Sequence, residues 1–285
     1  FLSIQEKVHM LITEYFSMKI SLGKEITSHL LNAVKKLKNV RMYEYTTLLD
    51  ILCDGSKCCG GIIRWPDGRE EQVEADYVIL ATGGIGGTYK HSTNFKHLTG
   101  DGVEIARRHN IELKNLDYVQ IHPTTLYSDN KEERSFLISE SVRGEGARLY
   151  DKNMNRFVDE LLPRDLLTQE IYKQMEKDGT DFVWEDLRTI PRDELISHFP
   201  NIIEHCSQAG YDVFHECIPI VPAQHYFMGG IKVNHNSKTS MDHLYAVGET
   251  ACNGVHGKNR LASNSLLESL VFAKRAAKEI AGERR

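Results

Sequence analysis

The segment from Val247 to Leu270 contains the residues whose types and spacing are best suited to chemistry. It begins at the end of an apolar run, 244–247, and places a carboxylate, Glu249, directly after that run. A loop then leads to the cation Arg260 and to a small, polar helix start at 262–265. In open α/β sheets, ligands bind beyond the carboxyl ends of the strands, where helix N-termini present free N–H groups. This order predicts a clamp for a hydroxyl-rich cofactor, with a cationic substrate anchor beside it.

Two further segments are predicted to approach the same sheet edge. The apolar run Tyr77–Ala81 reads as a buried strand that ends at the glycines Gly83 and Gly84. Residues 99–108 predict a helix, with Asp101 as its N-cap or as an acid of its first turn. Capping alone would account for Asp101, and capping does not exclude a contact with a ligand.

The N-terminal third supplies elements but no chemical motif. Apolar residues recur at helical spacing from Lys24 to Lys38, which predicts a helix. Strands are then predicted at 40–45, 47–53 and 61–65, with turns at 54–55 and 66–68. The sequence therefore predicts a helix followed by a β-meander ahead of the strand at Tyr77–Ala81.

Composition excludes several classes of protein. The chain has 285 residues, a formal net charge of −5 and no basic stripe with interleaved aromatic residues, which argues against a nucleic-acid partner. No apolar run reaches the roughly 20 residues that span a membrane, and no signal-peptide pattern opens the chain. Six cysteines without a C-x-x-C pair indicate neither a zinc site nor a disulfide framework, so no metal is predicted. A reducing cytoplasm is the expected setting.

Four motifs in a fixed order carry a resemblance to a known family. They are IHPTT at 121–125, SESVRGEGARL at 139–149 with LLPRD at 161–165, VPAQHYFMGG at 221–230, and GKNRLASNSLLE at 257–268. Together they resemble the L-aspartate oxidase family of the fumarate reductase/succinate dehydrogenase flavoprotein superfamily. The triplet Ala262-Ser263-Asn264 favours the oxidase branch, because succinate dehydrogenases typically carry Gly-Gly-Asn there.

The resemblance implies an α/β fold and FAD as cofactor. A partial FAD-binding domain of the two-dinucleotide, Rossmann-like type would comprise 1–115 and 226–285, and an α+β capping domain would be inserted at 116–225. The residues expected to contact the cofactor are Asp101, Glu249, Ser265, Leu266 and Gly84.

The resemblance also implies a small dicarboxylate substrate, which needs cations or hydrogen-bond donors at both ends. The expected substrate-binding residues are His122, Ser139, His225 and Arg260. Arg164 matches the family's catalytic arginine, and Glu140 and Arg143 match a proton relay. Taken singly, each histidine would more often be structural, and Arg164 could simply pair with Asp165. Only the joint match favours the functional interpretation.

The implied reaction is oxidation of L-aspartate to iminoaspartate, with oxygen or fumarate as acceptor, in the quinolinate branch of NAD biosynthesis. Because the product is unstable, a functional link to quinolinate synthase is implied. Two alternatives remain: a succinate dehydrogenase or fumarate reductase type of flavoprotein, and an inactive fragment that binds no flavin. The sequence departs from the family pattern at Lys258, where alanine is common, and at 184–187, where an aromatic-Leu-Asp run is more usual.

The phosphate-binding motif of dinucleotide domains is absent from the sequence. Such a domain opens with a strand and G-x-G-x-x-G, and the glycines at 83–87 do not have that spacing. Residues 1–22 do not match the family's flavin-contacting segment either. The chain is therefore expected to be an internal or truncated piece of a longer enzyme that, in isolation, holds FAD weakly or not at all.

Overall fold

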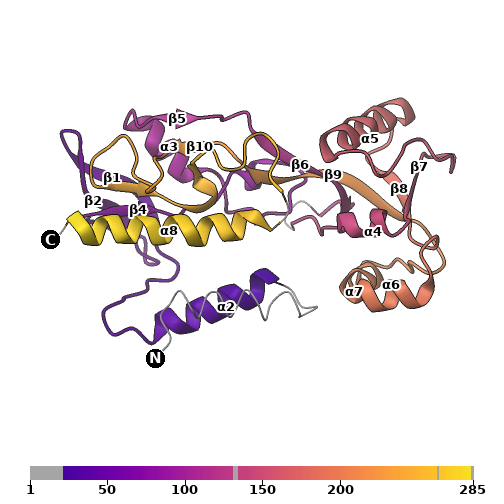
Figure 1. Cartoon of the computed structure of the whole chain (residues 1–285), viewed down its shortest axis with the longest axis horizontal. Helices are drawn as coiled ribbons and strands as arrows, with labels where there is room; N and C mark the ends of the chain where they lie inside the picture. The colour runs from indigo at the N-terminus through magenta and orange to yellow at the C-terminus, as the bar shows by residue number, and fades with distance from the viewer. Residues whose placement is uncertain (1–21, 131–133, 262, 284–285) are drawn as a thin grey trace. The chain divides into compact units, whose positions relative to one another are not determined.

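A computed structural model of the chain describes residues 22–130, 134–261 and 263–283 (Figure 1). The chain divides into two compact units, Phe1–Leu48 with Ile63–Glu71, and Leu49–Ile62 with Gln72–Arg285. The predicted domain boundaries at 116 and 225 both fall inside the second unit and stay predictions.

Helix α2 (Leu22–Lys35) confirms the N-terminal helix, although it begins and ends two to three residues earlier than predicted. The predicted strand at 40–45 is wrong, because no strand forms between α2 and Thr47. Tyr45 has a φ of 57°, in the left-handed region, which an extended strand cannot accommodate. Tyr43 instead packs edge-on against Trp65, with ring centroids 5.1 Å apart.

Strands β1 (Thr47–Asp54), β2 (Lys57–Arg64) and β3 (Glu70–Glu74) form a sheet in that order. Strand β1 matches the prediction, whereas β2 begins four residues before the predicted start at Gly61. Strand β3 was not predicted, because its sequence EEQVE is exposed throughout and lacks an apolar alternation.

A second group of elements surrounds the sheet edge where the cofactor clamp was predicted. Strand β4 (Val78–Leu80) pairs in parallel with β11 (Leu244–Ala246), and Leu244 is the register partner of Val78. Strand β11 is fully buried as predicted, but in β4 only Leu80 is buried and Ile79 is 46% exposed. Among the described residues β4 has only β11 as a partner, which leaves its other side open.

Short elements complete this region. Strand β10 (Gly230–Lys232) lies between β12 (Ala251–Cys252) and β5 (Leu113–Lys114). The remaining elements are η1 (Gly86–Thr88), α3 (Asp101–Arg108), η2 (Gly248–Thr250) and the long helix α8 (Asn264–Glu283). Helix α8 runs beside β4 in Figure 1, and its Ala276 packs against Tyr245 and Val247.

An antiparallel sheet with the order β6-β9-β8-β7 forms the rest of the second unit. Its strands are β6 (Val119–Leu126), β7 (Arg148–Tyr150), β8 (Val183–Asp186) and β9 (Ile218–Phe227). The helices around it are α4 (Glu140–Gly144), α5 (Arg164–Asp178), α6 (Arg192–His198) and α7 (Pro200–Gln208). Pro163 and Pro191 directly precede helices α5 and α6 as their N-caps.

The apolar core of this sheet-and-helix layer is continuous. Leu149 and Ile218 of the sheet pack with Leu167 and Ile171 of α5, and all four are fully buried. In Figure 1, β6 and β9 extend from the region of α3 and β10 to the region of α4. The two long strands therefore place residues of both regions around one site. No helix in the described part of the chain is long and apolar enough to cross a membrane.

Candidate functional site

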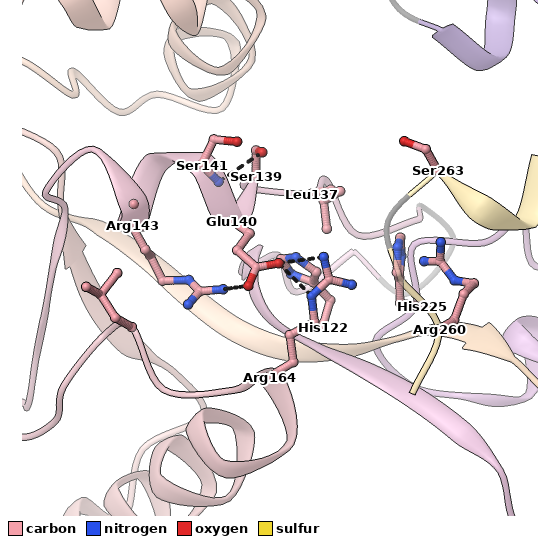
Figure 2. Close-up of a pocket in the computed structure, with 12 residues that line it drawn as sticks. His122, Leu137, Ser139, Glu140, Ser141, Arg143, Arg164, His225, Arg260 and Ser263 are labelled. Atoms are coloured by element: carbon pink, nitrogen blue, oxygen red, sulfur yellow. Dashed lines mark hydrogen bonds and ion pairs between the residues drawn. The ribbon is translucent and has the colours of Figure 1, made fainter. Parts of the chain in front are cut away.

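A cavity of about 630 Å³ lies where β6, β9, α4, α5 and the loop before α8 meet (Figure 2). The four predicted substrate-binding residues and the three predicted catalytic residues all line it. The lining consists of His122, Leu137, Ser139, Glu140, Ser141, Arg143, Gly144, Leu161, Arg164, His225, Arg260 and Ser263. The structure thus brings together seven predicted side chains that are up to 138 positions apart in the chain, from His122 to Arg260.

Arg164 and Glu140 form the closest ion pair of the cavity. The Nη2 atom of Arg164 lies 2.6 Å from Oε2 of Glu140, and its Nε donates to the same oxygen at 2.8 Å. On the other side of Glu140, Oε1 lies 4.0 Å from Nη2 of Arg143. These contacts produce an Arg164–Glu140–Arg143 chain of charges, and no Arg164–Asp165 ion pair occurs in the described ranges. The alternative structural pair with Asp165 is therefore wrong.

Local structure explains how α4 presents its charged residues. Ser139 is the N-cap, and its side chain accepts a hydrogen bond from the backbone N–H of Ser141 at 3.3 Å. This cap starts the helix at Glu140, so that Glu140 and Arg143, three residues apart, lie on one helical face. The Ser139 hydroxyl keeps its own proton as a donor for a ligand.

His122 and His225 lie next to each other in the cavity, with ring centroids 5.5 Å apart. His122 is only 1% exposed, and burial lowers its pKa well below the usual value, helped by His225 and Arg164. Burial, together with Arg260 and Arg164, lowers the pKa of His225 to about 3. Both imidazoles are therefore neutral at pH 7, so each has one N–H donor and one acceptor nitrogen.

Arg260 is held by its neighbours but keeps a free donor. Its guanidinium lies over the Tyr226 ring, 4.7 Å from the centroid, and Nη1 lies 3.4 Å from Oγ of Ser265. The Nε of Arg260 and the Nη1 of Arg164 are buried without a hydrogen-bond partner among the described residues. Buried N–H donors without partners cost free energy, so two positively charged arginines with incomplete hydrogen bonding line a cavity that favours an anionic ligand.

The charges of the cavity lining favour a dianion. Three arginines and one glutamate line it, whereas the two histidines are neutral. A ligand with two carboxylates would balance this excess of two positive charges in a partly desolvated site.

A second cavity of about 490 Å³ shares Leu137, His225 and Arg260 with the first. It is lined by two of the predicted cofactor residues, Glu249 and Ser265, and also by Thr93, Asn94, Arg134, Ser135, Phe136 and Tyr226. The predicted cofactor and substrate residues therefore border adjoining spaces, and His225 and Arg260 form part of the common wall.

Glu249 and Gly84 have a specific geometric relation. Glu249 Oε1 accepts a hydrogen bond from the backbone N–H of Phe227 at 2.9 Å. Burial raises the pKa of the Glu249 carboxyl to about 7. A Cβ atom at Gly84 would lie 2.2 Å from Oε1 of Glu249, so a larger residue fits here only if the Glu249 carboxylate shifts. A buried carboxylate in a polar cavity fits the hydroxyl-rich part of a flavin nucleotide, for which it offers acceptor oxygens.

The other predicted cofactor residues are less directly placed. Asp101 is exposed on the first turn of α3, where Thr99 Oγ1 donates to its Oδ1 at 2.7 Å, and Gly100 is the N-cap. Leu266 is half-buried on α8, which begins at Asn264. Neither residue lines the two cavities, so their cofactor roles stay predictions. The predicted helix start at Ala262 lies outside the described residues.

Sequence reasoning missed the residues that hold His225 in place. Thr93 Oγ1 lies 2.8 Å from Nδ1 of His225, and Asn94 Nδ2 donates to the backbone oxygen of His225 at 3.2 Å. Ser92 Oγ and Asn94 Nδ2 also donate to Oε1 of the buried Gln224. The Ser-Thr-Asn sequence at 92–94 has the composition of an ordinary loop. Only the motif that contains Gln224 and His225, which is distant in sequence, indicated a site in this region. In the described part of the chain, no cluster of His, Cys, Asp or Glu could hold a metal ion.

Comparison with known proteins agrees with this geometry. Residues 5–266 match a family model described as FAD binding domain. The chain is 52% identical to an L-aspartate oxidase of Clostridium perfringens over 258 residues, which is 90% of this chain and 58% of that protein. It is 40% identical to the L-aspartate oxidase of Bacillus subtilis, over 90% of this chain and 47% of that protein. The chain thus spans about half the length of the curated relatives it matches.

Solved structures show the same relationship. An E. coli quinol fumarate reductase has a TM-score of 0.73 and 34% sequence identity, over 82% of this chain and 44% of that chain. The expected α/β FAD-binding fold and the expected fumarate reductase superfamily are therefore confirmed. The chain belongs to the FAD binding domain family, whose cofactor is FAD.

Proposed function

We propose that the protein carrying this chain oxidises L-aspartate to iminoaspartate with FAD, and that oxygen or fumarate then accepts the electrons. The most direct support is the excess of two positive charges in the lining of the first cavity, which adjoins the cavity lined by the predicted cofactor residues. The identity of 52% to a relative named L-aspartate oxidase supports the substrate.

The dicarboxylate would bind between the two ends of the cavity. Figure 2 shows His225 and Arg260 beside each other, on the side away from Arg143 and Glu140. The guanidinium groups of Arg260 and Arg164, which both line the cavity, would each take one carboxylate. The neutral His122 and the Ser139 hydroxyl add donors without adding charge.

When bound, FAD supplies the hydride acceptor for the Cα hydrogen of the substrate. The residues of this chain would orient the substrate and handle the proton that leaves its amino group. Arg164 is a poor base, because a guanidinium keeps its proton at neutral pH. Because its Nη2 lies 2.6 Å from Glu140, Arg164 would pass one of its own protons to that carboxylate as it takes the proton of the substrate, with Arg143 as the next charge in the chain. We assign Arg164 the catalytic role, and Glu140 and Arg143 the relay.

A second candidate function is a succinate dehydrogenase or fumarate reductase type of reaction. It is favoured by the structural likeness to the E. coli quinol fumarate reductase at 34% identity. The same cavity charges suit succinate or fumarate, so the amino group of the substrate is what distinguishes the two proposals.

Three further assignments belong to the proposed function. An unstable imine product requires an enzyme that consumes it, and quinolinate synthase is the proposed functional partner. A cytoplasmic setting is proposed, because none of the six cysteines that the structure describes forms a disulfide. The division into FAD-binding parts 1–115 and 226–285 around a capping domain 116–225 is also proposed.

The decisive test is anaerobic reduction of the FAD-loaded protein by a substrate. The reduction is measured as the loss of visible flavin absorbance. L-aspartate should bleach the flavin and succinate should not; bleaching by succinate alone would establish the second candidate. Arg260→Met should prevent bleaching at aspartate concentrations that saturate the wild type. Lys258→Met is the matched control, because Lys258 lies over the Tyr118 ring and does not line the cavity. Equal bleaching in the Arg260 and Lys258 variants would contradict the proposed substrate anchor.

A further inference from the structure

Glu185 is a buried carboxyl group for which the proposed mechanism has no role. It lies on β8 between its register partners Leu149 of β7 and Ile218 of β9, and it is 0% exposed. Neither Oε1 nor Oε2 has a hydrogen-bond partner among the residues that the structure describes. An ionisable group buried without hydrogen bonds is costly, so its presence in this core requires an explanation.

Arg143 has buried hydrogen-bond donors that lack acceptors. Its Nη1 donates to the backbone oxygen of Glu160 at 2.7 Å, but Nε and Nη2 lack a hydrogen-bond acceptor among the described residues. Nε and Nη2 form one edge of the guanidinium, the edge that can bind both oxygens of a carboxylate. Two unpaired donors and two unpaired acceptors are thus buried in one unit of the fold.

The hydrogen bonds around Glu160 place the two groups in the same region of the core. Glu160 accepts from Arg143 through its backbone oxygen, and from the backbone N–H of Leu149 through Oε1 at 2.9 Å. Leu149 is the register partner of Glu185. Glu185 therefore lies opposite Leu149 on the neighbouring strand. Glu160 accepts hydrogen bonds from both Leu149 and Arg143, and so connects the two regions.

The charged and titratable groups that act on Glu185 come from three elements. They are Arg143 of α4, Glu160 of the segment before α5, and Cys206 of α7. Burial raises the pKa of Glu185 to about 8, against the opposing effect of Arg143. Burial also raises the pKa of Cys206 to about 12, so this thiol stays neutral in the range where Glu185 ionises.

Arg143 connects this buried carboxyl group to the cavity. It lines the cavity and lies 4.0 Å from Glu140, which pairs with Arg164 at 2.6 Å. We propose that Glu185 is a positioning residue that acts through Arg143 and sets the positive charge that a dicarboxylate meets in the cavity. This inference rests on the proposed function, because it requires a dianionic ligand in the cavity.

The direction of the effect follows from the charges. Below about pH 8 Glu185 is neutral, Arg143 has no carboxylate partner on that side, and the positive charge of the cavity is greatest. Above that pH the new negative charge offsets Arg143, and a dianion binds less tightly. A charge roughly 10 Å from each of two carboxylates, at an effective dielectric constant near 20, changes binding on the order of 100-fold.

The test uses succinate, whose two carboxylates are fully ionised above pH 7 and which has no amino group to titrate. Its dissociation constant is measured by calorimetry on the FAD-loaded protein between pH 6.5 and 9.5. Wild-type affinity should fall on the order of 100-fold across this range. Glu185→Gln should match the wild type at pH 6.5 and lose most of that fall. Glu185→Leu, which fills similar space without a polar group, provides the same readout if the glutamine variant does not fold.

Two comparisons isolate Glu185. Glu249 lines the adjoining cavity and has a pKa raised by burial to about 7, so its titration contributes a weakening that wild type and variant share. Gln174→Met removes another buried polar group with an unpaired nitrogen, on α5, and should leave the pH profile unchanged. Parallel profiles for wild type and Glu185→Gln would refute the inference. Failure of the wild type to bind succinate at every pH would instead refute the second candidate function and the inference, whereas failure of L-aspartate to bleach the flavin would refute the proposed function.

Discussion

Replacing Gly84 with alanine tests whether Glu249 is held in position for the cofactor. The added Cβ would lie 2.2 Å from Oε1 and 2.6 Å from Cδ of Glu249. Because nonbonded carbon and oxygen atoms do not approach this closely, the carboxylate has to move by about 1 Å. That movement would disrupt the 2.9 Å hydrogen bond from the backbone N–H of Phe227.

The cost can be estimated from the hydrogen bond that a displaced Glu249 carboxylate would no longer accept from a cofactor hydroxyl. A buried polar group that loses its partner costs about 1–3 kcal/mol, and every 1.4 kcal/mol corresponds to about tenfold in affinity. FAD should therefore bind Gly84→Ala roughly 10- to 100-fold more weakly than it binds the wild type. The assay is a titration of the apoprotein with FAD, followed by quenching of flavin fluorescence.

Two further variants make the result specific to Glu249. Gly282→Ala adds the same methyl group where nothing lies within 4 Å, and its FAD affinity should equal that of the wild type. The double variant Gly84→Ala/Glu249→Asp shortens the carboxylate side chain by one methylene and should recover part of the lost affinity. An unchanged dissociation constant in Gly84→Ala would refute the role of Glu249 in the cofactor site.

Three other predictions follow from the charged groups. Arg164→Lys keeps the positive charge but loses the two contacts with Glu140 at 2.6 and 2.8 Å. In steady-state assays, kcat for aspartate should therefore fall at least about 100-fold, and KM should change less. Burial lowers the pKa of His225 to about 3, so between pH 3 and 6.5 the unfolded chain binds a proton that the folded chain does not. The free energy of unfolding should therefore rise with pH in this range, and His225→Asn should flatten that rise in denaturant titrations. Glu160 is fully buried and accepts from Arg156 at 2.7 Å, so Glu160→Gln should lower the free energy of unfolding by about 3 kcal/mol, seen as a lower thermal midpoint.

Much of the site could be predicted from the sequence, because its residues belong to motifs that a family resemblance identifies. His122, Ser139, His225 and Arg260 come from four separate segments, and the structure places all of them around one cavity. No spacing rule would have joined them, since they are brought together by the long strands β6 and β9 and by the cap of α4. Local patterns did predict some elements, such as the helix over Asp101–Arg108. Its first turn is acidic, one of its faces is apolar and its last turn is basic, and each of these features favours a helix.

The failures have local physical causes. Strand β3 was missed because its exposed EEQVE sequence is held by pairing with β2 and not by burial. The strand expected at 40–45 failed because apolar and aromatic residues can pack as a loop, as Tyr43 does against Trp65. The support of His225 by Thr93 and Asn94 was missed because polar loop residues have no periodicity to read.

Burial of charge links the fold to the proposed chemistry. Arg143, Glu160 and Glu185 are each at most 2% exposed, in a unit whose core cluster consists mostly of Leu, Ile and Val side chains. Apolar residues of similar volume would usually stabilise such a core as well or better. Glu160 is compensated by bonds from Arg156 and from the backbone of Leu149, whereas Glu185 and one edge of Arg143 are not. Arg143 lines the cavity, and under the role proposed for Glu185 the cost of burying both groups is retained for control of the cavity's charge and not for stability.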